Sequence, residues 1–280
     1  MTLKNLVCVL CMSFAVLSCT TEDNETDINE VEGLTMVQEL SNNTHTIELF
    51  NANGKFLTGY NAISIRVKDK VSNTYIENAS ITWNPVMQMP TMQHSCPKSA
   101  IIKAIGKTTV YEGFIIYQMA NLDGTGWSLT VNYTINDVAY SVTDTITVIQ
   151  AENQNVTTFT GSDSKRYIMA LIDPKAPKIA INKLKVGLFK METMMSFPVV
   201  ENYTITLDPR MPSMGNHSSP NNTNLTYNSE DTMYHGNLSL TMTGYWVLNL
   251  KLLNAQNEVL KGEAVTTENI QSSLYLELEF

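Results

Sequence analysis

Short segments in which apolar and polar residues alternate recur along this chain of 280 residues. Alternation with a period of two places the apolar side chains on one face of an extended strand. The clearest such segments are residues 46–50, 62–67, 129–135, 143–148, 179–190, 203–207, 238–242 and 247–253. Turn sequences such as Asn53-Gly54 and Asn136-Asp137 lie between them, and no long stretch has a helical period. The sequence therefore predicts an all-β protein built as β-sandwiches.

One short string occurs twice in the chain. Residues 89–97 read Met-Pro-Thr-Met-Gln-His-Ser-Cys-Pro, and residues 211–220 read Met-Pro-Ser-Met-Gly-Asn-His-Ser-Ser-Pro. We call them the first and the second Met-Pro string. Their flanking residues repeat in the same order, as the pairs Pro85 and Pro209, Tyr111 and Tyr234, Gly113 and Gly236, and Trp127 and Trp246. The aromatic members of these pairs are expected to pack in the core.

The repeat predicts a duplicated domain, because order, spacing and residue type agree over about 60 residues. We expect two tandem immunoglobulin-like β-sandwich domains, at residues 34–150 and 165–280. The polar stretch from Ala151 to Ser164 is the expected linker.

The N-terminus is typical of a secreted lipoprotein. Lys4 precedes a mostly apolar run that ends at Ser18, and this run is too short to span a bilayer. The residues Val-Leu-Ser-Cys that end at Cys19 resemble a bacterial lipobox, in which the cysteine is lipidated and becomes the mature N-terminus. An ordinary secretory signal cut nearby is the alternative. We therefore predict a signal peptide at residues 1–18 and membrane attachment through Cys19.

An acidic segment follows the predicted lipidation site. Residues 19–33 carry acidic side chains and no basic ones, which is typical of a solvated, flexible tether. Thr20 directly after Cys19 favours an outer membrane lipoprotein, on the periplasmic face or on the cell surface. The acidic run also resembles the surface-export signal of lipoproteins from Bacteroidetes-type bacteria, although a plain spacer would have the same composition.

The net charge restricts the classes of partner. The full chain carries a net charge of −9 at pH 7, and removal of the signal peptide takes away one further basic residue, Lys4. A negative charge spread along the chain argues against nucleic acid as a partner and against charge-driven binding to anionic lipid.

Each Met-Pro string combines thioether and imidazole groups, which form a soft ligand set. Such a set suits Cu(I) or another soft metal better than Mg²⁺ or Ca²⁺. The candidate ligands are Met89, Met92, His94 and Cys96 in the first string, and Met211, Met214 and His217 in the second, with His235 entering from a facing hairpin. The alternative is structural, because methionine is a common core filler.

Cys96, residues 191–195 and His45 each require a separate prediction. Cys96 is the only cysteine left besides Cys19 once the signal peptide is removed, and a lone cysteine is often an inert buried residue. Residues 191–195 form a further Met cluster, either a hairpin turn near the second string or an exposed apolar patch. His45 is expected on the surface.

The second half resembles a known family in several motifs. Residues 208–217, followed by Tyr234-His235-Gly236 and by residues 242–246, are similar to the YtkA-like family. Its members are small extracytoplasmic immunoglobulin-like domains, often found beside copper-handling and cytochrome-oxidase assembly proteins. The resemblance implies the sandwich fold and a metal-accepting or other cell-envelope protein as a partner. Asn216 departs from the usual Met-Gly-His run, which would shift His217.

No arrangement of catalytic residues emerges. The chain has no Gly-rich phosphate loop, no Gly-x-Ser-x-Gly and no His-Glu-x-x-His. We therefore expect a lipid-anchored binding protein rather than an enzyme. One hypothesis is sequestration of Cu(I) by the two strings. The other is a surface interaction or adhesion-type module in which the strings are structural and bind no metal.

Overall fold

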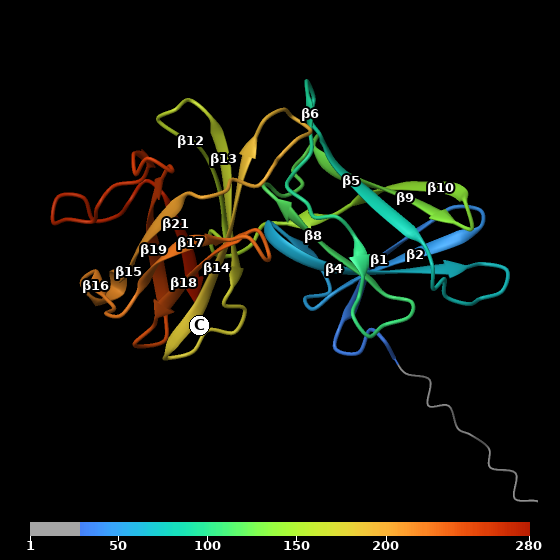
Figure 1. The fold of residues 1–280 in the computed structure, drawn as a ribbon, viewed down its shortest axis with the longest axis horizontal. Coiled ribbons are helices and arrows are strands. Elements are labelled where there is room, and N and C mark those ends of the chain that lie inside the picture. Colours follow the sequence, from blue (N-terminus) through green and yellow to red (C-terminus); the bar gives the residue numbers. More distant parts are fainter. Residues whose placement is uncertain (1–28) are drawn as a thin grey trace, which may run out of the picture.

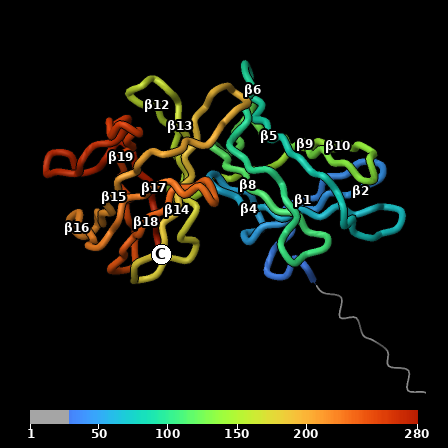
Figure 2. Tube along the Cα trace, viewed as in Figure 1, coloured from blue at the N-terminus to red at the C-terminus, as the bar shows by residue number. Residues whose placement is uncertain are grey.

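The computed structural model describes residues 29–280. The predicted signal peptide, Cys19 and most of the predicted tether lie outside the described residues. Figure 1 and Figure 2 show two β-rich bodies side by side, one formed by each half of the chain. Within residues 29–280 the only helical element is a short 3-10 turn, Pro212–Met214, and no helix is long and apolar enough to cross a membrane. The predicted all-β fold is confirmed.

The first domain is a sandwich of two antiparallel sheets. One sheet has the order β1 (Thr35–Ser41), β2 (His45–Asn51), β4 (Gly59–Asp69), β8 (Tyr111–Tyr117) and β7 (Ile102–Lys103). The other has the order β10 (Val138–Ile146), β9 (Gly126–Ile135), β5 (Ser80–Gln88) and β6 (Gln93–His94). A small pair joins β3 (Phe56–Leu57) to β11 (Val148–Ile149). The orders β2-β4-β8-β7 and β10-β9-β5-β6 are those of strands A-B-E-D and G-F-C-C′ in an immunoglobulin domain.

The second domain repeats this topology. Its strands follow the order β12 (Val156–Thr160), β13 (Arg166–Asp173), β14 (Ile181–Met191), β18 (Met233–Ser239), β17 (Thr223–Asn228), β15 (Thr204–Met211), β19 (Tyr245–Leu253) and β20 (Val259–Lys261). Off this path, β16 (His217–Ser218) pairs with β15, and β21 (Tyr275–Glu279) pairs with β19. The longer β17 also pairs with β15 and so links the two sheets, whereas β7 of the first domain pairs with β8 alone. The two tandem immunoglobulin-like sandwiches are as predicted.

The repeated tyrosines make the same hydrogen bonds in both domains. The Tyr111 hydroxyl donates to the carbonyl oxygen of Glu77 at 2.6 Å, and the Tyr234 hydroxyl donates to that of Val200 at 2.9 Å. Each hydroxyl also accepts a backbone N–H from the segment leading into strand C. Both side chains are buried, so each tyrosine ties strand E to the start of strand C from inside the sandwich.

The repeated tryptophans are equivalent as well. The indole Nε1–H of Trp127 donates to the carbonyl oxygen of Met119 at 2.9 Å, and that of Trp246 donates to Met242 at 3.1 Å. Both rings are almost completely buried in the core of their domain. The expectation that these aromatic residues pack in the core is confirmed.

The glycines of the repeat permit a close approach to strand E. A Cβ atom at Gly113 would lie 2.7 Å from the ring of Trp83, and one at Gly236 would lie 2.8 Å from the carbonyl oxygen of Thr223. Any larger residue would therefore push the neighbouring strand or ring away. Both domains therefore require a glycine at this position of strand E, although the atoms that leave no room for a side chain differ between the domains.

An apolar cluster joins the two domains, and we call it the interdomain cluster. The first domain contributes the buried Ile116 with Tyr60 and Phe114 packed beside it. The second domain contributes Ile168, Ala170, Ile172, Phe189 and Met233, with Val156, Met191, Phe197 and Val199 packed against them. The cluster makes the pair of sandwiches a single packed unit. The segment expected as a linker contains β12, which pairs with β13 within the second domain.

The first domain extends into the segment expected as a tether. Val31 is buried against Phe50 and Val110, and the carboxylate of Glu30 accepts hydrogen bonds from the backbone and the hydroxyl groups of Thr108 and Thr109. Burial alone would raise the pKa of Glu30, but these hydrogen bonds outweigh it and lower the pKa to about 2. Residues 29–33 therefore belong to the folded domain.

Replacing Glu30 by glutamine tests this attachment. The folded-state pKa lies below the ordinary value of 4.5, so the carboxylate contributes stability above pH 4.5 and loses it as the pH falls toward 2. We expect Glu30→Gln to lower the free energy of unfolding by about 1 kcal/mol at pH 7. Denaturant unfolding at several pH values, with Glu32→Gln as the control, measures it. The stabilising role of the Glu30 carboxylate would be contradicted if the wild type and Glu30→Gln differed in unfolding free energy by the same amount at pH 2 as at pH 7. An equal loss of stability in Glu32→Gln would contradict it as well.

Candidate functional site

The first Met-Pro string forms the C–C′ hairpin of the first domain. Met87 pairs with His94 across β5 and β6, and the backbone N–H of Met89 donates to the carbonyl oxygen of Met92 at 3.0 Å. Pro90 and Thr91 occupy the turn between them. Residues directly opposite each other, and residues two apart on one strand, share a face of the ribbon. The structure therefore brings Met89, Met92 and His94 to the same face, together with Met87.

Exposure increases along this face from the core to the tip of the hairpin. Met87 is fully buried in the core of the first domain, Met89 is half-buried, and 47% of Met92 is exposed. His94 is half-buried, with its ring edge against Trp127 at a centroid distance of 5.5 Å. Its Nδ1 lies 2.8 Å from the carbonyl oxygen of Ser95. Because a carbonyl oxygen only accepts, Nδ1 donates this hydrogen bond, and in the neutral imidazole the lone pair that can bind a metal lies on Nε2.

Cys96 is buried, unlike Met92 at the tip of the hairpin. Only 2% of Cys96 is exposed, and it lies in the core of the first domain. This burial raises the pKa of the thiol far above its usual range. The side chain is therefore a neutral thiol in the native protein and not the thiolate that a soft metal binds best. The structure does not place Cys96 with Met92 at the tip.

The burial of Cys96 predicts an unreactive thiol. In the native protein at pH 8, a maleimide or a disulfide reagent should modify Cys96 only as fast as the first domain opens. Addition of a denaturant should expose the thiol and give complete modification within minutes. Mass spectrometry of the folded and the unfolded chain measures both rates. Equally fast labelling of the two states would show that the thiol is accessible.

The second Met-Pro string has a different structure. It leaves β15 at Met211, forms the 3-10 turn Pro212–Met214 and returns along β16. Met211 is buried, and its methyl group fits against Gly244, where a Cβ atom would lie only 2.8 Å from it. Met214 is 55% exposed and His217 is also exposed. The structure therefore places the methionines of this string in different environments, with Met211 serving as a core residue.

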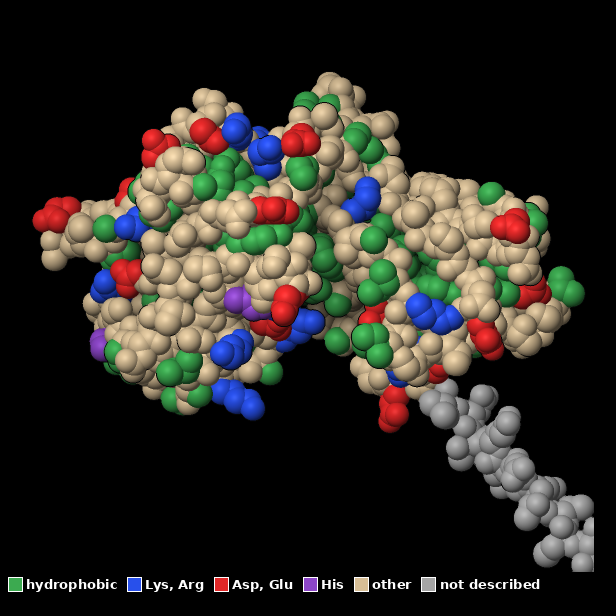
Figure 3. All heavy atoms as spheres, in the orientation of Figure 1, with side chains coloured by type: hydrophobic (Ala, Val, Ile, Leu, Met, Phe, Trp, Pro, Cys, Tyr) green, Lys and Arg blue, Asp and Glu red, His purple; other side chains and the backbone are tan. Residues whose placement is uncertain are grey.

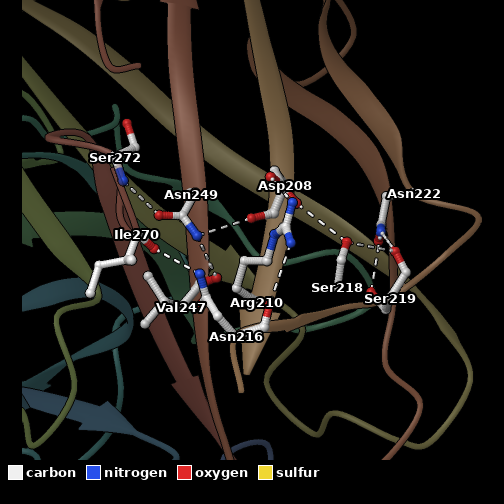
Figure 4. A network of polar contacts seen from close by, with 10 residues as sticks. All are labelled: Asp208, Arg210, Asn216, Ser218, Ser219, Asn222, Val247, Asn249, Ile270 and Ser272. Atoms are coloured by element: carbon white, nitrogen blue, oxygen red, sulfur yellow. Dashed lines mark hydrogen bonds and ion pairs between the residues drawn. The ribbon is translucent and has the colours of Figure 1, made fainter. Parts of the chain in front are cut away.

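A polar network holds the second string in place (Figure 4). Arg210 donates two hydrogen bonds to the carboxylate of Asp208, at 2.8 and 2.9 Å, and a third to the carbonyl oxygen of Asn216 at 3.3 Å. The side-chain amide of Asn216 donates to the carbonyl oxygen of Ile270 at 2.9 Å. A bidentate pair of this kind is among the strongest polar contacts in proteins. The first domain has Asn84 and Val86 at the equivalent places, so its string lacks the network.

Asn216 has a conformational role as well. Gly215 and Asn216 both have a positive φ, of 64° and 60°, which turns the chain back so that His217 pairs with Met211. Asparagine tolerates this left-handed conformation better than most residues. The extra residue relative to the usual Met-Gly-His run is therefore accommodated in a tight turn that the network secures.

His235 does not approach the second string. Its neighbour on β18, Tyr234, is buried in the core that also contains Met211, so His235 faces the opposite side of the sheet. There its Nε2 lies 2.9 Å from both carboxylate oxygens of Asp231. The prediction that His235 enters the second string is therefore wrong, because side chains alternate between the two faces of a strand.

The Met cluster at residues 191–195 lies beside the first string and not the second. Thr193 and Ser196 pair across a turn, which places Met194 and Met195 at its tip, each 46% exposed. The backbone N–H of Ser95, next to His94, donates to the carbonyl oxygen of Met194 at 2.8 Å. We call this turn the B–C hairpin, because it joins β14 and β15, which are strands B and C of the second domain. In Figure 1 and Figure 2 the segment between β14 and β15 reaches across to β6.

A polar hollow lies on the outer face of the second domain. Its volume is about 820 Å³, and it is formed by strands β14, β17 and β18 with the loop that follows β13. Its lining includes Lys175, Lys183, Lys185 and His235, with the amide side chains of Asn182, Asn224 and Asn237. Figure 3 shows basic, acidic and histidine side chains gathered on the second domain beside the junction with the first.

The charges in this polar hollow are partly neutralised. Lys185 forms an ion pair with Asp231 at 2.9 Å, and His235 contacts the same carboxylate. Partial burial would raise the pKa of Asp231, but the hydrogen bonds from Lys185 and His235 lower it. Lys175 and Lys183 are exposed, and within residues 29–280 neither forms a salt bridge. The lining also includes the carboxylate of Asp173, and the Lys175 ammonium nitrogen lies 5.6 Å from the ring centroid of Tyr60. With Lys175 and Lys183, the hollow still carries more positive than negative charge.

Groups of acidic, histidine and cysteine residues do not form a metal centre in the described part of the chain. Over residues 29–280, no three such side chains are grouped closely enough to hold an ion.

Comparisons with known proteins do not identify a function for this chain. No family model matches the chain, and no curated protein matches it. The resemblance to the YtkA-like family stays a prediction from the motifs. A similar solved structure is the Escherichia coli adhesin FdeC, with 15% sequence identity and a TM-score of 0.26. The match covers 80% of this chain and 64% of the adhesin chain. At this TM-score the similarity carries no argument about function.

Proposed function

We propose that this protein is a non-enzymatic interaction module of the bacterial cell envelope, attached through a lipid on Cys19. It would lie at the outer membrane and bind an acidic saccharide in the polar hollow of the second domain. The observation that carries the proposal is this hollow, in which amide groups and the exposed ammonium groups of Lys175 and Lys183 line a shallow, open surface.

The lining of the polar hollow matches the chemistry of a sugar acid. Small apolar ligands require an enclosed and mostly apolar pocket, which this surface does not provide. Amide side chains both donate and accept hydrogen bonds, as hydroxyl-rich ligands require. The ammonium groups of Lys175 and Lys183 favour a carboxylate on the ligand. Neutral sugars and cationic ligands would offer these two ammonium groups no carboxylate, and Lys175 would keep only its contact with the Tyr60 ring.

The framework of the hollow supports a binding role. The hollow is ordered before any ligand arrives, because most of its lining belongs to the paired strands β14, β17 and β18 of the second domain. Tyr60 of the first domain is close enough to the hollow that Asp173 and Asp231 affect it. Burial chiefly raises the pKa of this tyrosine, and the two carboxylates raise it further. A preorganised surface loses less entropy on binding.

The proposal is tested on an array of saccharides that differ only in carrying a hydroxymethyl or a carboxylate group. We expect the protein to bind the acidic members and to lose binding as salt is added. Lys175→Ala/Lys183→Ala should weaken binding roughly fivefold, because two exposed ion pairs contribute about 1 kcal/mol together.

The matched control removes two charges elsewhere, as Lys55→Ala/Lys165→Ala. This variant should bind acidic saccharides as the wild type does. Equal binding of neutral and acidic saccharides, or an equal loss in the control, would contradict the proposed ligand.

A second candidate function is the binding of Cu(I), because Met89, Met92 and His94 share one face of the first string. Thioether and neutral imidazole groups bind Cu(I) without releasing protons. The second string does not support the same role, since Met211 is a core residue and a polar network occupies the turn. A Cu(I) affinity that is the same in the wild type and in Met89→Leu/Met92→Leu would contradict this candidate.

A further inference from the structure

The two domains present exposed methionines to the same region of the surface. Met92 lies at the end of the C–C′ hairpin of the first domain, and Met194 and Met195 lie at the tip of the B–C hairpin of the second. Their exposed fractions are 47%, 46% and 46%. The thioether groups at these tips are accessible to a ligand from solvent, and methionine is common at binding surfaces that adapt to their ligand.

Specific contacts hold these two hairpins together. The N–H of Ser95 donates to Met194 across the domain boundary at 2.8 Å, and the Ser95 hydroxyl donates to the carbonyl oxygen of Pro85 at 2.7 Å. The next residues along the chain are held as well, because the N–H of Ile116 donates to Pro97 at 2.9 Å. On the other side, Met191 and Phe197 at the base of the B–C hairpin pack in the interdomain cluster. Both hairpins are therefore fixed relative to each other.

His94 is next to the contact between the two hairpins, because it immediately precedes Ser95, the residue that contacts the B–C hairpin. Its Nδ1–H donates to the Ser95 carbonyl oxygen, so in the neutral imidazole the lone pair lies on Nε2. A metal-binding histidine commonly donates its other ring N–H to a backbone carbonyl group in this way.

We propose that Met92 and His94 of the first domain bind one Cu(I) ion together with Met194 or Met195 of the second domain. This inference rests on the Cu(I) candidate function and assigns part of that site to the other domain. The ligands are neutral thioethers and a neutral imidazole, which are soft donors that favour Cu(I). Binding involves no change of oxidation state and no bond cleavage. The flexible methionine side chains can adjust around the ion once the hairpins are in place.

The site spans the domain boundary, so metal binding would stabilise the interdomain contact as well as each hairpin. A ligand that binds only the native arrangement raises the midpoint of thermal unfolding by mass action. Loss of the second domain's methionines should therefore weaken both Cu(I) binding and the thermal stabilisation that Cu(I) produces.

The experiment is a titration of the full chain with Cu(I) against a chromogenic chelator under reducing conditions. Leucine replaces methionine in each variant, because it preserves volume and apolar character and removes only the sulfur. We expect Met92→Leu and Met194→Leu/Met195→Leu each to weaken Cu(I) binding by at least about tenfold. X-ray absorption spectra of the copper-loaded chain should show fewer sulfur scatterers in the Met194→Leu/Met195→Leu variant.

Met36→Leu/Met214→Leu is the matched control, since these methionines are 47% and 55% exposed at other places on the surface. It should bind Cu(I) as the wild type does. If Met89→Leu/Met92→Leu weakens binding and Met194→Leu/Met195→Leu does not, the first string binds alone and the interdomain site is wrong. If none of these variants differs from the wild type, the Cu(I) function itself is wrong. If these methionines only contact an apolar partner, every methionine-to-leucine variant should bind that partner as the wild type does.

Discussion

The apolar contact between the two sandwiches determines which of their surfaces lie side by side. Ile116 of the first domain and Phe189 and Met233 of the second are buried in it. Burial of each large apolar side chain contributes about 1.5–3 kcal/mol relative to exposure. The cluster therefore fixes the angle between domains that a polar linker alone would leave free. It brings the B–C hairpin of the second domain to the first string and places the polar hollow beside Tyr60.

Duplication has preserved the framework of the domain and changed its C–C′ turn. Tyr111 and Tyr234 make the same hydrogen bonds in their sandwiches, because strand E must be tied to strand C in both copies. The C–C′ turns take no part in these hydrogen bonds and can therefore differ between the copies. In the first copy the turn is a plain hairpin that carries its methionines toward the surface. In the second copy the ion pair between Asp208 and Arg210 closes the turn, and Met211 fills the core.

The sequence predicts the strands and the duplication well, because period-two alternation and repeated core aromatics are local signals. It also contains the signal that separates His235 from the second string, since the neighbouring Tyr234 was expected in the core. Other features depend on contacts between distant segments. His45 was expected on the surface, yet it is buried against Tyr133 and Tyr140. The B–C hairpin reaches the first string only because the domains pack as they do, and the polar hollow combines strands that lie far apart in the chain.

Rigid coupling of the two sandwiches is the central claim, and NMR relaxation of the backbone amides measures it directly. If the interdomain cluster holds the domains as one body, both sandwiches will show the same rotational correlation time, that of a single particle of the whole folded size. Distinct and shorter correlation times for the two domains would show independent motion. In that case a metal site shared by the two hairpins would not exist as described.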